Sequence, residues 1–93
     1  MSISREIVVH HKIGLHARPA ASFVKAANSF VSRITVENLT KGTAPVNARS
    51  ILSVLSSAVQ MNDQVRITAD GNDAEAAVDA LCGLISSNFG ELE

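Results

Sequence analysis

The chain has 93 residues, of which 46% are apolar and 3% aromatic, and its formal net charge is −1. This length supports one compact core and is short for two domains, so we expect a single domain spanning residues 1–93. The absence of Trp and Tyr and the near-zero charge argue against stacking on nucleic-acid bases and against general attraction to nucleic acid or anionic lipid.

The first predicted elements are a strand and a helix. In residues 5–9 a period of two favours Ile7 and Val9 on one face, which predicts a half-buried strand that ends near His10. From Ala17 to about Asn28, apolar residues recur at helical spacing and form one stripe. The pair Asn28-Ser29 is expected to end this helix.

Two strands are predicted next. Ile34 and Val36 alternate with polar residues and indicate the second strand, and residues 38–42 supply a polar turn. The third strand, at about residues 43–46, contains Pro45. Proline has no N–H to donate to a sheet ladder, so we place this strand at an edge of the sheet.

The second half of the chain predicts helix, strand and helix. Asn47 is expected to cap a short helix that runs to about Val59. A fourth strand follows in residues 65–70. Asn72, with Glu75 three residues later, predicts the start of a last helix with a long apolar stripe. The order β-α-β-β-α-β-α predicts a two-layer α+β sandwich whose helices cover one face of the sheet.

The only cysteine, Cys82, falls on the apolar stripe of the last helix, so we expect a buried core thiol. Residues 1–9 lack the long apolar run of a signal peptide, and no segment approaches bilayer length. We therefore expect a cytoplasmic protein without membrane insertion.

The stretch Gly14-Leu15-His16-Ala17-Arg18-Pro19 places one imidazole and one guanidinium at the start of the first helix. The first turn of a helix leaves N–H groups without intrahelical partners and carries partial positive charge, so an anion there is favoured. Gly14 permits a left-handed backbone, and Pro19 is tolerated in a first turn. We therefore place His16 at the helix entrance.

These residues suit phosphoryl transfer, which needs a neutral ring nitrogen as nucleophile, a nearby cation and N–H donors. The helix start and Arg18 should keep His16 largely neutral near pH 7, and Arg18 could pair with phosphate oxygens. The sequence has neither a Gly-rich Lys loop for a nucleotide nor an Asp-rich cluster for magnesium, so we expect no cofactor. The phosphate would come from, and leave to, another protein. Spacing alone leaves open an ordinary solvated capping histidine.

A metal site at His10, His11 and His16 is a further possibility. Adjacent strand residues point to opposite faces, however, and no acid or thiol completes a ligand set. We therefore expect no metal.

Ser50 falls in the first turn of the predicted short helix, which would tolerate a phosphate. Phosphorylation would place about −1.5 to −2 charges beside Ile51, Leu52 and Leu55. If these side chains face a partner, the modification would oppose docking. Otherwise they belong to the core and Ser50 supports the cap.

The segment GLHARPAA, followed by Phe23-Val24-Lys25, resembles the active-site segment of HPr, the histidine phosphocarrier family of the bacterial sugar phosphotransferase system. The resemblance covers nearly the whole chain, including residues 47–52, Asp70-Gly71 and the last helix. It implies an open-faced sandwich in which a four-stranded antiparallel sheet is covered on one face by three helices.

The resemblance also implies a function. His16 would accept phosphate from phosphorylated enzyme I and pass it to IIA domains of sugar permeases, assisted by Arg18. Ser50 matches the regulatory serine that HPr kinase/phosphorylase modifies, and Ile51 and Leu52 match part of the apolar partner surface, in which we also include Leu55. A transcriptional regulator is a further implied partner. The chain would act as a monomeric carrier rather than as a stand-alone enzyme.

The chain departs from the family pattern in two places. Ile13 stands before Gly14 where the family usually has a polar residue, and Ser57-Ala58 replaces a common Leu-Gly. The alternatives are a regulatory binding protein controlled through its serine, a nitrogen-branch phosphocarrier, and an HPr domain detached from a fused protein.

Overall fold

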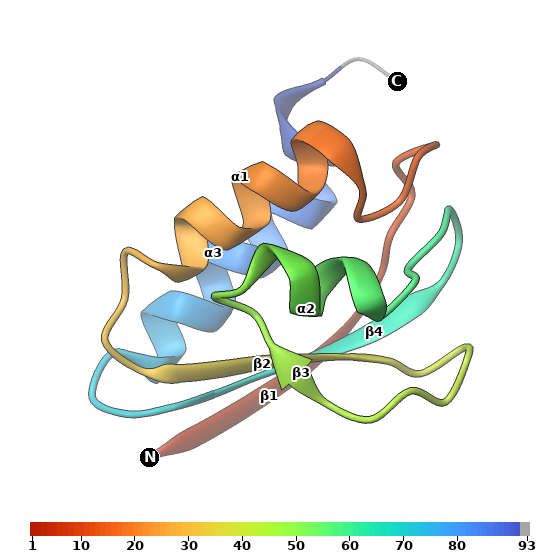
Figure 1. Ribbon diagram of the computed structural model, residues 1–93. Coiled ribbons are helices and arrows are strands. Elements are labelled where there is room, and N and C mark those ends of the chain that lie inside the picture. Colours follow the sequence, from red (N-terminus) through yellow and green to blue (C-terminus); the bar gives the residue numbers. More distant parts are fainter. Residues whose placement is uncertain (92–93) are drawn as a thin grey trace.

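The computed structural model describes residues 1–91. Figure 1 shows a sheet with the helices packed on one of its faces. The elements in chain order are β1 (Ser2–Val8), α1 (Ala17–Ala27), β2 (Arg33–Asn38), β3 (Val46–Asn47), α2 (Ile51–Ser56), β4 (Gln64–Asp70), α3 (Ala74–Ser86) and a 3-10 turn, η1 (Asn88–Gly90).

The sheet has four antiparallel strands in the order β1-β4-β2-β3. In the central strand β4 the apolar residues Val65, Ile67 and Ala69 are buried, while the residues between them face the open side. This period of two lets one face of the sheet meet the helices and leaves the other to solvent. The open-faced α+β sandwich expected from the sequence is therefore confirmed.

The two longer helices bury one stripe each against the sheet. In α1 the buried side chains recur at helical spacing, and α3 does the same over a longer span. Cys82 lies on the α3 stripe and is 6% exposed. Burial raises the pKa of its thiol, so the expected core thiol is confirmed. The buried residues are Pro19, Ala20, Phe23 and Ala27 in α1, and Ala74, Ala77, Val78, Leu81, Cys82 and Ile85 in α3.

The edge strand is shorter and later than the sequence predicts. β3 pairs with β2 only at Val46 and Asn47, so the expected strand at residues 43–46 is largely wrong. Pro45 lies just outside it, because a proline cannot donate to the ladder. The position of this strand at the sheet edge is confirmed.

The short helix begins and ends at other residues than expected. Asn47 belongs to β3, and its side-chain oxygen accepts from the Arg49 N–H at 2.9 Å. Ser50 is the N-cap instead, outside the first turn, and its Oγ accepts from the Ser53 N–H at 3.3 Å. The helix ends at Ser56 rather than near Val59, and Ala58 follows with φ +53°.

Two other boundaries also differ from the expected ones. β1 begins at Ser2 and ends at Val8, because the pairing with β4 extends along its whole length. The N-cap of α3 is Asp73 rather than Asn72, and its side chain does not cap the helix. Its carboxylate instead accepts hydrogen bonds from the N–H groups of Val31 and Ser32 in the loop before β2.

A buried carboxylate holds the turn between α2 and β4. Asp63 is 7% exposed and accepts from Asn38 Nδ2 at 3.0 Å, from the Gln60 N–H at 2.9 Å and from Lys41 Nζ. Burial would raise the pKa of Asp63, but these hydrogen bonds outweigh it and hold the pKa below its usual range. The Asp63 carbonyl in turn accepts from the Val9 N–H at 2.9 Å, which ties the turn to the end of β1.

Candidate functional site

The loop between β1 and α1 is fixed by a close backbone approach at Gly14. This glycine has φ +68°, and a Cβ built on it would lie 2.1 Å from the Val59 carbonyl oxygen. The Leu15 N–H donates to that same oxygen at 3.1 Å. Both the left-handed backbone and the lack of space therefore require glycine immediately before the segment that carries His16.

His16 lies at the N-cap of α1, as the sequence predicts. Its backbone is extended, with φ −133° and ψ 164°, and its half-buried side chain makes no capping hydrogen bond. Ala17 follows with φ +50°, a conformation that costs about 1–2 kcal/mol for a residue with a Cβ. Pro19, the third helical residue, has no N–H to satisfy. The imidazole thus stands at the positive end of α1, beside N–H groups without intrahelical partners.

Arg18 is directed to the segment after α3. Its side chain is 82% exposed, and its guanidinium donates to Glu91 Oε1 at 3.3 Å. The same oxygen lies 2.9 Å from Nε2 of His11, which is 2% exposed. The hydrogen bond from His11, helped by the charge of Arg18, holds the pKa of Glu91 below its usual range.

His11 and Glu91 are residues that the sequence reasoning missed at this site. The sequence suggests His11 only as a metal ligand and gives no signal for Glu91. They are 80 positions apart in the chain, and no local pattern links them. His10 is exposed whereas His11 is buried, so the two do not face one way. Within residues 1–91, no group of three or more His, Cys, Asp or Glu side chains is arranged to hold a metal ion.

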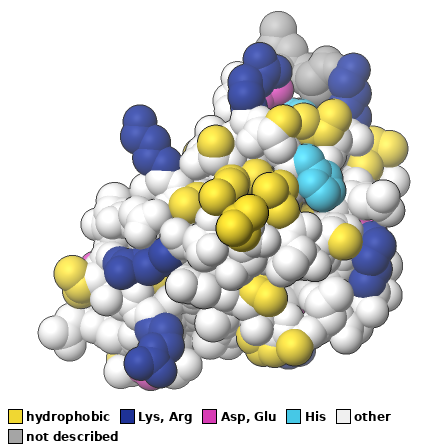
Figure 2. Space-filling model, in the orientation of Figure 1, with side chains coloured by type: hydrophobic (Ala, Val, Ile, Leu, Met, Phe, Trp, Pro, Cys, Tyr) yellow, Lys and Arg dark blue, Asp and Glu magenta, His cyan; other side chains and the backbone are white. Residues whose placement is uncertain are grey.

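An exposed apolar area lies over α1 and α2. Ile51 is 40% exposed and Leu52 76%, whereas Leu55 is half-buried and packs against the core. Figure 2 shows apolar side chains gathered on this face with a histidine side chain next to them. Ser50 precedes Ile51 as the N-cap of α2, so a modifiable hydroxyl borders the exposed pair.

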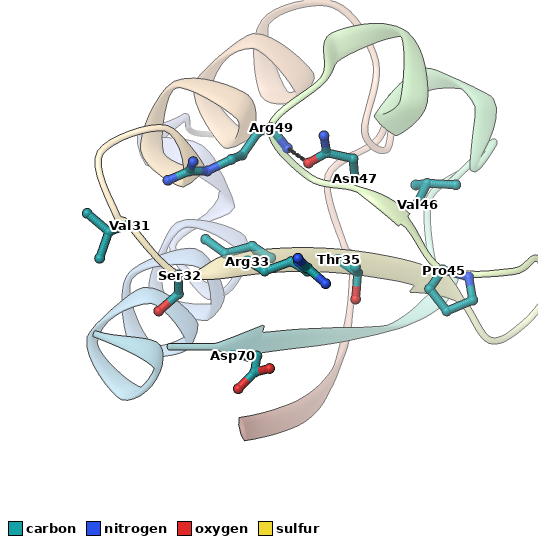
Figure 3. Close-up of a pocket in the computed structure, with 10 residues that line it drawn as sticks. Val31, Ser32, Arg33, Thr35, Pro45, Val46, Asn47, Arg49 and Asp70 are labelled. Carbon is teal, nitrogen blue, oxygen red and sulfur yellow. Dashed lines mark hydrogen bonds between the residues drawn. The ribbon is translucent and has the colours of Figure 1, made fainter. Parts of the chain in front are cut away.

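A separate hollow of about 700 Å³ lies at the β2–β3 edge of the sheet, lined in part by Arg33, Thr35 and Arg49 (Figure 3). The Arg49 carbonyl accepts from the Asn28 side chain, at the C-terminal end of α1. His16 lies at the other end of that helix, about 18 Å from Asn28 along the axis. None of the site residues expected from the sequence lines this hollow.

No helix in the described part of the chain is both long and apolar enough to cross a membrane.

The open-faced sandwich carries a histidine without a side-chain capping hydrogen bond at a helix N-terminus, with an exposed apolar area beside it, and this arrangement suits a small phosphoryl-carrying domain. Residues 3–87 match the family model described as "PTS HPr component phosphorylation site". The chain therefore belongs to the HPr family of phosphocarrier proteins of the phosphotransferase system.

Three similar proteins illustrate the relationship. The chain is 35% identical to the phosphocarrier protein HPr of Cupriavidus necator over 91 residues, which cover 98% of this chain and 99% of that protein. It is 40% identical over 89 residues to the multiphosphoryl transfer protein of Salmonella typhimurium, covering 96% of this chain but only 24% of that longer protein. It therefore spans about a quarter of that relative's length.

Among solved structures, HPr-C-His from Thermoanaerobacter tengcongensis is similar with a TM-score of 0.92 and 44% identity. The match covers 98% of this chain and 99% of that one.

Proposed function

We propose that this protein carries a phosphoryl group on His16, accepting it from phosphorylated enzyme I and donating it to IIA domains of sugar permeases. The observation that carries the proposal is the position of His16 at the N-cap of α1, half-buried and without a capping hydrogen bond. Membership of a phosphocarrier family supports the same chemistry.

The residues around His16 support each part of that reaction. The unprotonated ring nitrogen supplies the lone pair for the new P–N bond as the bond between phosphorus and the donor breaks. The phosphate oxygens would then meet the N–H groups of the first turn of α1, which carry partial positive charge. Arg18 is two residues further on and exposed, so its guanidinium can turn to the phosphate and pair with its oxygens. This arrangement uses no cofactor of its own.

Docking is assigned to the exposed apolar side chains next to this site. Ile51 and Leu52 offer apolar surface that a partner would bury, and Leu55 on the same helix is half-buried and packs against the core. A carrier must bind and leave several partners in turn, which suits a small contact of this kind. We therefore propose that enzyme I and the IIA domains share this surface and that the carrier acts as a cytoplasmic monomer.

Ser50 is proposed as a regulatory site for HPr kinase/phosphorylase. A phosphate on this N-cap would suit the helix start and would add about −1.5 to −2 charges directly before Ile51 and Leu52. Burying that charge in an apolar interface is unfavourable, so the modified protein would dock poorly with enzyme I. The new charge would also allow a transcriptional regulator to distinguish the phosphorylated protein from the unmodified one.

The test is incubation with enzyme I and phosphoenolpyruvate, followed by intact mass measurement. We expect one acid-labile phosphate on the native chain and on a Ser50→Ala variant, and none on His16→Ala. Addition that survives in His16→Ala, or no addition to the native chain, would overturn the proposal.

A further inference from the structure

One carboxylate oxygen joins a buried histidine to the arginine at the proposed phosphoryl site. Glu91 Oε1 lies 2.9 Å from His11 Nε2 and 3.3 Å from the Arg18 guanidinium. Within residues 1–91, the Arg18 side chain has this hydrogen bond and none to His16. We call the three residues His11, Glu91 and Arg18 the latch.

The hydrogen bonds of His11 assign its tautomer. The Ile13 N–H donates to His11 Nδ1 at 3.2 Å, so Nδ1 carries no proton. Nε2 therefore carries the ring proton and donates it to Glu91, and the ring is neutral. Because a neutral ring does not cancel the charge of Glu91, the carboxylate remains a full anion in front of Arg18.

His11 is held firmly enough to fix the position of that anion. Its side chain is 2% exposed, and its carbonyl accepts from the Gly14 N–H at 2.9 Å. The ring meets Phe89 edge to face, with centroids 6.1 Å apart and an interplanar angle of 77°. Phe89 itself packs against the core. Glu91 is thus anchored to a buried group, unlike an ordinary surface ion pair between two mobile side chains.

We propose that His11 is a positioning residue, which holds Glu91 against Arg18 so that Glu91 competes with the phosphate on His16 for the same guanidinium. This inference rests on the proposed function of His16. Phosphoryl transfer itself breaks the P–N bond of the donor and forms one to His16, and within the latch only hydrogen bonds change. Glu91 and the phosphate would draw on the same guanidinium, so in this proposal Arg18 exchanges one for the other and the latch makes His16 a readier donor to the next protein.

The expected size of the effect follows from the exposure of Arg18, the mobile partner of the pair. Arg18 is largely in solvent, and exposed ion pairs shift equilibria by about two- to five-fold. A Glu91→Gln variant keeps the shape but removes the charge that Arg18 meets. His11→Leu removes the anchor with an apolar side chain of similar size, whereas His11→Gln restores an N–H near the position of Nε2.

The test is a competition for limiting phosphate. Each unlabelled variant is mixed with an equal amount of ¹⁵N-labelled native protein, catalytic enzyme I and half an equivalent of phosphoenolpyruvate, and intact masses give the partition. We expect Glu91→Gln and His11→Leu to hold about two- to five-fold more phosphate than the native chain. His11→Gln and the charge-matched control Glu75→Gln, on the exposed first turn of α3, should share it equally.

Two results would overturn the inference while leaving the carrier function intact. The first is that Glu91→Gln accepts phosphate normally from enzyme I but holds no more of it than the labelled native chain. This result does not depend on whether His11→Leu folds. The second is a long-range ¹H–¹⁵N spectrum of the unphosphorylated protein in which the proton of His11 is on Nδ1. If neither the native chain nor a variant takes phosphate from enzyme I, the proposed function is wrong, and so is the proposed competition between Glu91 and the phosphate for Arg18.

Discussion

Replacing Gly14 with alanine tests how the fold places the histidine. The new Cβ would lie 2.1 Å from the Val59 carbonyl oxygen and 2.7 Å from the Gln60 Cα. Both neighbours are backbone atoms, so neither can rotate away. The loop before α1 or the turn after α2 must move by more than about 1 Å to reach ordinary van der Waals contact.

The cost has three sources. A left-handed alanine costs about 1–2 kcal/mol, and forcing atoms into a packed region costs about 1–3 kcal/mol more. The hydrogen bond from the Leu15 N–H to Val59 would be strained or lost, at about 1 kcal/mol. We therefore expect Gly14→Ala to lower the free energy of unfolding by about 3–6 kcal/mol, a large part of the 5–15 kcal/mol of an ordinary domain.

Gly42→Ala is the matched control. Gly42 also has a left-handed backbone, with φ +71°, but a Cβ there meets nothing within 4 Å. Urea unfolding followed by circular dichroism should show a loss of only about 1–2 kcal/mol for this control. Phosphorylation by enzyme I should slow about 100-fold in folded Gly14→Ala, because a shift of 1 Å misplaces the nucleophile. If the two variants unfold within about 0.5 kcal/mol of each other, the close approach at Gly14 does not determine this loop.

Three further changes separate stability from docking. Asp63→Asn should cost about 2–4 kcal/mol in urea unfolding, because the hydrogen bonds to the buried carboxylate weaken. Since the pKa of Asp63 is lowered on folding, the stabilisation from its carboxylate is complete above the ordinary aspartate pKa of about 3.9 and is lost as the pH falls below it. Between pH 5 and 2 the free energy of unfolding should therefore fall less steeply for the variant than for the native chain, and an unchanged slope would contradict this. Ser50→Ala should lower the free energy of unfolding by about 1 kcal/mol through loss of the cap, against less than about 0.5 kcal/mol for Ser56→Ala. Leu52→Ser should keep native stability but raise the KM for enzyme I about 5- to 10-fold. The control is Val31→Ser, at a similarly exposed position in the loop before β2, which should leave the KM unchanged.

The parts of the fold that local patterns specify were predictable. The alternation in residues 64–70 marks the central strand, because each inward residue is apolar and buried. The helical spacing after His16 marks α1, and Pro19 limits where that helix starts. The place of His16 at a helix N-terminus follows from these two signals, so the sequence alone identifies the proposed nucleophile.

Boundaries and long-range contacts were not predictable from the same signals. Each of the two later helices has two favourable candidates for its N-cap, Asn47 and Ser50 for α2, and Asn72 and Asp73 for α3. Sheet pairing and loop contacts decide between the candidates. Asn47 pairs with β2 as part of β3, and the carboxylate of Asp73 accepts a hydrogen bond from the loop before β2. The contact between His11 and Glu91 depends on how the segment after α3 returns to the loop before α1, which no local pattern encodes.

The most direct test of the account is a two-step transfer. The protein is phosphorylated by enzyme I, separated from it, and mixed with an unphosphorylated IIA domain, and both intact masses are followed with time. We expect one phosphate to leave His16 and the same amount to appear on the IIA domain over the same time course. Phosphate that stays on the chain, or that is released to solvent without reaching the IIA domain, would contradict it.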